Sequence, residues 1–392
     1  MILKFFIAVV AFSSLFSTSC GQNRRDKEEP GSINQISEDS ENDAGENINS
    51  GKQKFTVDTI ITGLQNPWGM VFLPNNKILI TERPGRVRIV QNGQLQKEEI
   101  KNVPDVHARG QGGLLDIQLH PDYKTNGWIY FSYSKPGKGG AATAVSRAKF
   151  NGNSFTEIQE IFVAQPFINS NMHFGCRLAF DNDNYLYIST GERGTKANAQ
   201  KLNNHYGKVL RIHDDGEVPD DNPFMNTTDA KPEIWCYGNR NVQGLYFDKT
   251  NNILWAHEHG PRGGDEINII QKGKNYGWPV VTYGIDYDGS IISNLKEKEG
   301  IETPVHVWTP SIAPCGMTMV TGNRYPEWKG NLLVGALVLQ HVARVEIKNK
   351  KAVSEERLLE DIARVRDVRE APDGYIYILT ENPGMFLRLV PQ

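Results

Sequence analysis

Two side chains that could move a proton, His173 and Glu192, stand at the ends of neighbouring predicted strands. His173 lies in MHFGCRLAFD (172–181) just ahead of an apolar strand, and Glu192 follows the next strand in STGERG (189–194). Antiparallel neighbours would bring both residues to the same end of one sheet. A carboxylate beside a histidine orients the ring and raises its basicity, which suits a general base. The alternative, a purely structural histidine, stays open at this point.

Cationic side chains occur in two further segments. In WCYGNRNVQGLYFD (235–248), Arg240 and Asn241 stand between an aromatic start and an apolar strand. Arg240 could pair with a carboxylate of the protein or stabilise negative charge that develops during a reaction. Arg364 and Arg366 alternate in RVRDV and share one face of a predicted strand. Two adjacent arginines indicate an anionic ligand, or an internal carboxylate, between them.

Oxygen ligands for a hard cation are predicted in HEHGPRGGDEINIIQKGKNYGWP (257–279). The glycines and the proline around Gly260 and Pro261 indicate an irregular loop whose carbonyl groups are free of the sheet ladder. With Asp265 and Glu266, these carbonyls offer the kind of ligands that calcium prefers.

A glycine-rich segment, ARGQGGLLDIQLHPD (108–122), contains Gln111 between Gly110 and Gly112. Glycines allow a backbone to come close to a ligand, and Gln111 could form a hydrogen bond with it. A turn-rich entry into a strand is the alternative, and this segment taken alone favours it.

The elements that must position these groups follow a recurring pattern. A turn rich in Asp, Asn, Gly or Pro leads into an alternating apolar run at 73–83, 120–134, 180–192, 247–260, 325–337 and 369–382. Each copy is typical of a β-hairpin, and a repeated unit of this size is typical of a propeller. We therefore predict an all-β, six-bladed β-propeller with four-stranded antiparallel blades. We expect the ring to close by pairing a strand near Phe55–Ile61 with Met385–Val390; a two-domain β-sandwich is the alternative.

The N-terminal region differs in composition from the rest of the chain. Residues 1–20 read as a signal peptide of the lipoprotein type, with Cys20 as the lipidated residue, although plain secretion is the alternative. Residues 21–53 are polar and acidic and are predicted to be a disordered linker to the propeller domain, 54–392. The chain is therefore expected to be exported and attached to a membrane only through a lipid anchor.

Composition narrows the classes of partner. The chain has 392 residues, of which 23% are charged, and a formal net charge of −3. No basic surface for nucleic acid is indicated. The remaining cysteines, Cys176, Cys236 and Cys315, match no zinc spacing, and their pairing is left open, as is the oligomeric state.

Three runs, YGNRNVQGL, EHGPRGGDEIN and NYGWP, occur in this order, and together they resemble the soluble quinoprotein sugar dehydrogenases. The resemblance is to the aldose sugar dehydrogenase branch of the glucose/sorbosone dehydrogenase family, and it extends from about Gln65 to Gly384. It implies a six-bladed propeller that uses pyrroloquinoline quinone (PQQ) and calcium.

The resemblance also implies roles for single residues. His173 matches the catalytic base, and Glu192 stands where glucose-specific members have an aspartate that supports this histidine. Arg240 would stabilise negative charge on the reduced cofactor. The matching cofactor contacts are Gln111, Arg240, Asn241, Tyr287, Arg364 and Arg366, and the matching calcium ligands are Gly260 and Pro261 at an inner site and Glu266 and Tyr276 at a structural site. One departure is Val338, where the family often has a lysine that meets the cofactor.

The implied function is oxidation of the C1 hydroxyl of an aldose to a lactone, by hydride transfer to PQQ and then to an external electron acceptor. Two alternatives remain, a calcium-dependent lactonase-like hydrolase and a non-enzymatic binding propeller. Axial candidates that are mainly arginine, histidine, glutamine and backbone carbonyl argue against the hydrolase. The missing lysine gives some support to the binding module.

Overall fold

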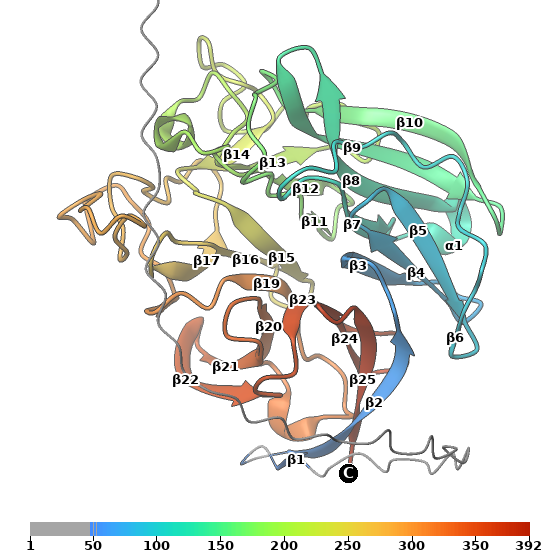
Figure 1. The fold of residues 1–392 in the computed structure, drawn as a ribbon. Coiled ribbons are helices and arrows are strands. Elements are labelled where there is room, and N and C mark those ends of the chain that lie inside the picture. Colours follow the sequence, from blue (N-terminus) through green and yellow to red (C-terminus); the bar gives the residue numbers. More distant parts are fainter. Residues whose placement is uncertain (1–47, 50, 52) are drawn as a thin grey trace, which may run out of the picture. The chain divides into compact units, whose positions relative to one another are not determined.

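A computed structural model describes residues 48, 49, 51 and 53–392 of the chain (Figure 1). The predicted signal peptide, the lipidated Cys20 and most of the predicted linker lie outside the described residues. The last part of the linker contributes a short strand, β1 (Ile48–Asn49), which pairs with β2 (Lys54–Thr62). Within the described residues, no helix has the length and apolar character needed to cross a membrane.

Six antiparallel sheets form the described part of the chain, as the sequence predicts. The first three blades are β3 (Pro67–Phe72), β4 (Lys77–Glu82), β5 (Arg86–Gln91) and β6 (Gln94–Leu95); β7 (Leu114–Leu119), β8 (Trp128–Gly137), β9 (Gly140–Phe150) and β10 (Phe155–Val163); and β11 (Leu178–Phe180), β12 (Leu186–Ser189), β13 (Lys208–Ile212) and β14 (Ile234–Tyr237). The short helix α1 (Tyr123–Asn126) and a 3-10 turn (Lys196–Gln200) lie between strands.

The other three blades complete the ring. They are β15 (Val242–Asp248), β16 (Ile253–Glu258), β17 (Asp265–Ile270) and β18 (His306–Trp308); β19 (Pro314–Met319), β20 (Leu332–Ala336), β21 (Val342–Lys348) and β22 (Lys351–Leu358); and β23 (Arg364–Glu370), β24 (Ile376–Glu381) and β25 (Met385–Pro391) with β2. A second 3-10 turn spans Pro326–Trp328. The pairing of β2 with β25, from Phe55 opposite Pro391 to Thr62 opposite Met385, confirms the predicted closure.

The six repeats in the sequence are the first hairpin of each blade. Each leads into the second strand, β4, β8, β12, β16, β20 or β24. In every hairpin an Asn or Gly with positive φ stands one or two residues before that strand, namely Asn76, Gly127, Asn184, Asn252, Gly330 and Gly374. These residue types tolerate the left-handed conformation that a tight turn needs, which is why the turns are readable from the sequence.

The first strands of the blades, β3, β7, β11, β15, β19 and β23, surround the propeller axis (Figure 1). Apolar clusters fill the spaces between successive blades; in one of them, Trp328 stacks on Tyr325 and meets Phe55 edge to face. Burial of both faces of each blade makes the ring rigid. The loops at the strand ends are therefore held in fixed positions around the axis.

Candidate functional site

A cavity of about 390 Å³ lies at the end of the ring where β3 begins and β4 ends. This volume is in the range of small-molecule sites. Its wall includes Trp68 and Phe174, the three arginines Arg83, Arg364 and Arg366, and Glu381. Residues from all six blades line it, and four of the predicted site residues are among them, namely Gln111, Asn241, Arg364 and Arg366.

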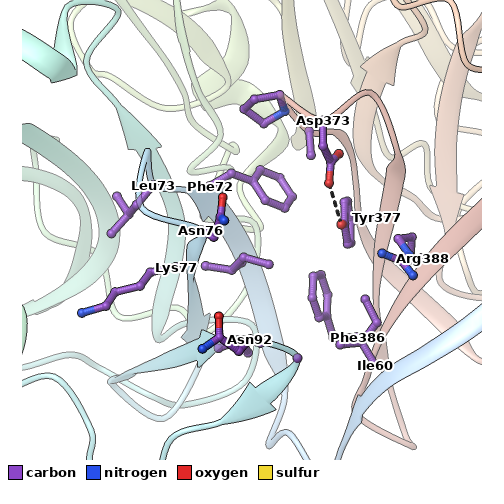
Figure 2. Close-up of a pocket in the computed structure, with 15 residues that line it drawn as sticks. Ile60, Phe72, Leu73, Asn76, Lys77, Asn92, Asp373, Tyr377, Phe386 and Arg388 are labelled. Carbon is purple, nitrogen blue, oxygen red and sulfur yellow. Dashed lines mark hydrogen bonds between the residues drawn. The ribbon is translucent and has the colours of Figure 1, made fainter.

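A larger cavity, about 560 Å³, lies between the first and last blades at their opposite end (Figure 2). Phe72, Tyr377 and Phe386 line it together with turn residues such as Asn76 and Asp373. None of the predicted site residues reaches this cavity, so the chemistry belongs to the smaller one.

His173 and Glu192 are in contact, with 2.8 Å between Nδ1 and Oε1. Both side chains are buried, and His173 has a φ of 53°, an uncommon value for a non-glycine residue that is enriched at functional sites. Burial lowers the pKa of His173, the hydrogen bond to Glu192 opposes this, and the charge of Arg240 adds to the lowering. His173 is therefore neutral at pH 7. With Nδ1 held by the carboxylate, Nε2 carries the lone pair, and it forms no hydrogen bond within the described residues.

Arg240 and Asn241 lie next to the pair of His173 and Glu192 in space. The amide of Glu192 donates to the carbonyl of Arg240 at 2.8 Å, which joins the two segments. The guanidinium lies 5.3 Å from the ring centre of Trp278 and donates to the carbonyl of Gly260 at 2.8 Å, while its Nε is buried without a partner. Asn241 accepts from the amide of Gly175 at 3.2 Å and lines the cavity.

Arg364 and Arg366 both lie at the cavity wall and share one carboxylate, Glu381. Arg366 binds it through Nε and Nη2, each at 3.0 Å, and Arg364 approaches it at 3.7 Å. The internal carboxylate considered as an alternative is therefore present. One carboxylate opposes two guanidinium groups, so a positive charge remains for an anionic ligand.

Gln111 acts through the backbone of the predicted base. Its Oε1 accepts from the amide of His173 at 2.7 Å, and its side chain lines the cavity. The neighbouring glycines approach protein rather than a ligand, which corrects the reading from the sequence. A Cβ on Gly110 would lie 2.4 Å from the carbonyl oxygen of Asn171, and one on Gly113 would lie 2.0 Å from that of Arg83.

Two predicted positions lie at the rim. Tyr287 is 69% exposed, and its ring centre is 5.9 Å from the guanidinium carbon of Arg240. It does not form part of the cavity wall. Val338 is 54% exposed, and its side chain offers no charge there.

One prediction for the calcium loop, that Asp265 is a ligand, is wrong. Asp265 is no free ligand, because its carboxylate accepts hydrogen bonds from the amides of Gly260, Ile312 and Ala313, at 2.7–2.9 Å, and from the hydroxyl of Ser311. It fixes the loop instead. The carbonyl of Gly260 accepts from Arg240 at 2.8 Å, and Gly260 lines a small cavity together with Glu258 and Glu266.

The outer calcium prediction fits the structure better. Glu266 lies opposite Glu258 across the pairing of β16 and β17, beside a cavity of about 10 Å³ that Tyr276 also lines. Burial raises the pKa of Glu258, and burial together with the charge of Glu258 raises that of Glu266. The amide oxygen of Asn268 is buried without a partner nearby. The phenol oxygen of Tyr276 is used by the backbone of Ile269 and Gln271.

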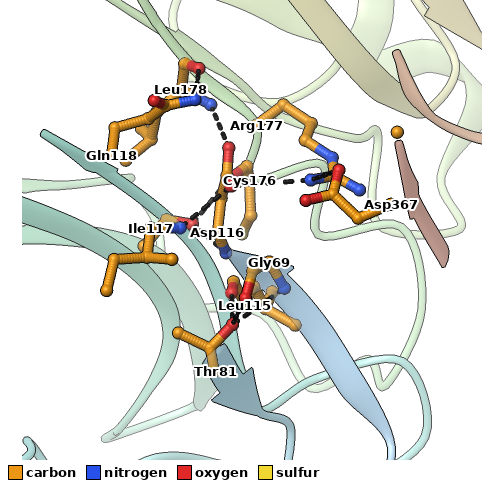
Figure 3. Close-up of polar contacts among 12 residues, drawn as sticks. Gly69, Thr81, Leu115, Asp116, Ile117, Gln118, Cys176, Arg177, Leu178 and Asp367 are labelled. Atoms are coloured by element: carbon orange, nitrogen blue, oxygen red, sulfur yellow. Dashed lines mark hydrogen bonds and ion pairs between the residues drawn. The ribbon is translucent and has the colours of Figure 1, made fainter. Parts of the chain in front are cut away.

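Arg177, which the sequence analysis did not select, is a buried residue, and its contact with Asp367 is drawn in Figure 3. Its guanidinium bonds Asp367 at 2.9 Å and the carbonyls of Gln243 and Arg366, each at 2.9 Å. Further contacts within 4.0 Å reach Asp116, Cys315 and Trp68. The axial place that a side-chain-held calcium would take in a propeller hydrolase is thus occupied by an arginine.

The three cysteines in the described part of the chain, Cys176, Cys236 and Cys315, are all buried and free, so the open question of their pairing is answered. Burial raises the pKa of Cys176 to about 12. Cys315 lies beneath the cavity and accepts from Arg366 at 3.2 Å.

A repeat within the blades identifies glutamates of which the sequence analysis selected only Glu192. Four second strands end in, or are soon followed by, a glutamate, and these are Glu82, Glu192, Glu258 and Glu381. Glu82 and Glu381 pair with arginines, whereas Glu192 contacts His173 and Glu258 accepts from the amide of Arg240. Alignment of the six hairpin copies against one another would have revealed this shared position. Arg83 follows the first of these glutamates directly.

The comparisons with known proteins agree with this geometry. The family model described as glucose/sorbosone dehydrogenase matches residues 64–388. The chain is 43% identical over 344 residues to an aldose sugar dehydrogenase, YliI, of Escherichia coli, covering 86% of this chain and 93% of that protein.

Solved structures give the same result. The soluble aldose sugar dehydrogenase of E. coli, in its apo form, matches with a TM-score of 0.84 and 42% identity, over 86% of this chain and 100% of that one. The PQQ-bound aldose sugar dehydrogenase of Streptomyces coelicolor matches with a TM-score of 0.70 and 29% identity, over 86% and 99%. This chain therefore belongs to the glucose/sorbosone dehydrogenase family.

Proposed function

We propose that this protein is a PQQ-dependent aldose sugar dehydrogenase that oxidises the C1 hydroxyl of an aldose to a lactone. The observation that carries the proposal is His173, which is uncharged, is held at Nδ1 by Glu192 and has Nε2 free beside a cationic cavity. The relatives named as aldose sugar dehydrogenases, one of them with PQQ bound, support the same assignment.

The residues present fit PQQ, a flat tricarboxylate. The cavity of about 390 Å³ is large enough for a small organic ligand and is lined by three arginines and one glutamate. Arg240 adds a guanidinium whose Nε is buried without a partner. PQQ, when bound, supplies the acceptor for the hydride that C1 loses.

The side chains then act as follows. Nε2 of His173 takes the proton of the C1 hydroxyl, and Glu192 stabilises the imidazolium that forms. The amide contact from Gln111 fixes the backbone of His173, so the ring keeps its position. The guanidinium of Arg240 stabilises negative charge that builds up in the cavity. The two electrons leave later to an external acceptor.

We propose two calcium sites, and the oxygen ligands that the protein supplies differ between them. Glu258 and Glu266 line one small cavity, and their carboxylate oxygens are the kind of ligand that calcium prefers, while the amide of Asn268 donates to Glu266 at 3.1 Å. The carbonyl of Gly260 accepts from Arg240, so a calcium ion held by the carbonyls of Gly260 and Pro261 depends on further oxygen ligands from the bound cofactor or water.

The test is dye-linked oxidation of a panel of aldoses by purified protein, with and without added PQQ and calcium. We expect activity only when both are present and its loss in His173→Ala. A matched control is His306→Ala, because His306 forms a similar 2.9 Å pair with Glu355 away from the cavity. No oxidation of any aldose by the loaded wild type, or equal loss in both variants, would contradict the proposal.

We further propose export of the protein and attachment through lipidated Cys20. Membrane fractionation should show release of a Cys20→Ser variant to the soluble fraction. Equal retention of the wild type and the variant would oppose the lipid anchor.

A further inference from the structure

We propose that Arg83 binds a carboxylate of the cofactor and supplies the cation that the family resemblance expects at position 338. The inference rests on the proposed function, because it names a further residue of the same cavity. Arg83 reaches the cavity from the first blade, whereas position 338 belongs to the fifth.

The backbone of Arg83 is fixed between two neighbouring segments. Its amide donates to the carbonyl of Asn66 and its carbonyl accepts from Leu114, both at 3.0 Å. The side chain passes directly over Gly113, where a Cβ would lie 2.5 Å from Cγ of Arg83. The side chain of Arg83 is therefore directed toward the cavity by packing against its neighbours.

Most donors of Arg83 are unused. Within the described residues, its side chain donates one hydrogen bond, from Nη1 to the carbonyl of Gly110 at 2.7 Å, and no carboxylate lies within ion-pair distance. A guanidinium has five N–H groups, so four remain. The guanidinium of Arg366, by contrast, donates hydrogen bonds to Glu381 and Cys315. Arg83 is thus a half-buried cation, and most of its N–H donors have no partner among the described residues and are available to a ligand.

The charge of the cavity wall requires such a partner. Three arginines, Arg83, Arg364 and Arg366, face a single carboxylate, Glu381, which leaves a net charge of +2. Burial and the two neighbouring arginines lower the pKa of Arg83, whereas the charge of Glu381 opposes this. A neutral sugar cannot balance this charge, but a polycarboxylate can.

Position 338 cannot perform this role. The side chain of Val338 is apolar and 54% exposed, and its amide is bonded to the carbonyl of Ile312 at 3.0 Å. The anionic edge of the ligand therefore finds its additional cation at Arg83.

The experiment measures the affinity of the apo protein for PQQ by quenching of tryptophan fluorescence, because Trp68 lines the cavity. Arg83→Gln should weaken binding about 10- to 100-fold, the range for a charge-assisted hydrogen bond. Arg83→Lys should retain most of the affinity. Arg109→Gln, a change to an exposed arginine outside the cavity wall, should stay within about twofold of the wild type.

Three further readouts separate recognition of charge from loss of structure. The affinity of the wild type should fall with salt more steeply than that of Arg83→Gln. The trimethyl ester of PQQ, which has no carboxylate charge, should bind the wild type and Arg83→Gln alike. Adding Val338→Lys to Arg83→Gln should restore part of the affinity, and the melting temperature of each apo variant checks its fold.

The outcomes distinguish two failures. Equal affinity of Arg83→Gln and Arg109→Gln for PQQ overturns the assignment of Arg83 and leaves the proposed function intact. A wild type that does not bind PQQ overturns the proposed function and the inference with it.

Discussion

The contact between Glu192 and His173 gives a prediction with a calculable size. In Glu192→Gln the side chain keeps its length and an acceptor for Nδ1–H, but the charge that stabilises the imidazolium is lost. A hydrogen bond to a charged group contributes about 1.5–3 kcal/mol, and about 1.4 kcal/mol corresponds to a factor of ten. We therefore expect kcat/KM to fall about 10- to 100-fold.

The pH dependence should change in a defined direction. Burial lowers the pKa of His173, and the contact with Glu192 raises it. Activity needs neutral His173, so it is present above this pKa and is lost as the pH falls through it. Removal of the charge of Glu192 leaves burial unopposed, so the acidic limb of kcat/KM should move to lower pH in Glu192→Gln.

The assay is dye-linked aldose oxidation by the PQQ-loaded protein across pH, with the melting temperature as a check on folding. Glu192→Asp is informative beside it, because a side chain about 1.5 Å shorter withdraws the acceptor from its 2.8 Å contact. It should lose at least as much activity. Glu355→Gln, in the similar pair with His306, is the control. Unchanged kcat/KM and an unmoved acidic limb in Glu192→Gln would refute the reasoning.

Three further changes test other parts of the site. Glu381→Gln should lower the free energy of unfolding of the apo protein by about 3–5 kcal/mol, because it leaves the buried Arg366 without its ion pair. Chemical unfolding measures this loss, and PQQ should raise the melting temperature of the variant more than that of the wild type. Glu266→Gln should abolish the rise in melting temperature that calcium gives the wild type, and an equal rise would argue against a calcium site there. In Gly113→Ala the new Cβ would lie 2.0 Å from the carbonyl oxygen of Arg83 and 2.5 Å from its Cγ, so Arg83 must move. PQQ binding should weaken as in Arg83→Gln, with the melting temperature as the check on folding; unchanged affinity would show that this packing does not matter.

Local signals explain why the fold could be predicted. Each hairpin places an Asn or Gly with positive φ next to an apolar strand, so the six copies are visible without long-range information. The same locality explains the pairing of His173 with Glu192, because their strands are neighbours in both sequence and space. The closure of β2 on β25 followed from the need to pair the last edge.

Contacts between distant blades could not be predicted in this way. Asp265 resembles a calcium ligand in the sequence, but the amides that satisfy it come from the next blade, at Ile312 and Ala313. Alternation placed Arg364 and Arg366 on one face, but did not show that Glu381 stands between them or that Arg83 is near. Such partners are set by the closed ring and not by spacing along the chain.

Arg177 has a consequence for how the molecule comes apart. Its side chain contacts the first strand of each of the other five blades, through Asp116, Gln243, Cys315, Asp367 and Trp68. No single blade or pair of blades provides all of these partners, so the set of contacts is complete only when the last blade docks. Contacts that form after the rate-limiting step control the rate of unfolding and have little effect on the rate of folding. Arg177 should therefore act chiefly on the lifetime of the closed ring, and with it on how long a bound cofactor stays enclosed.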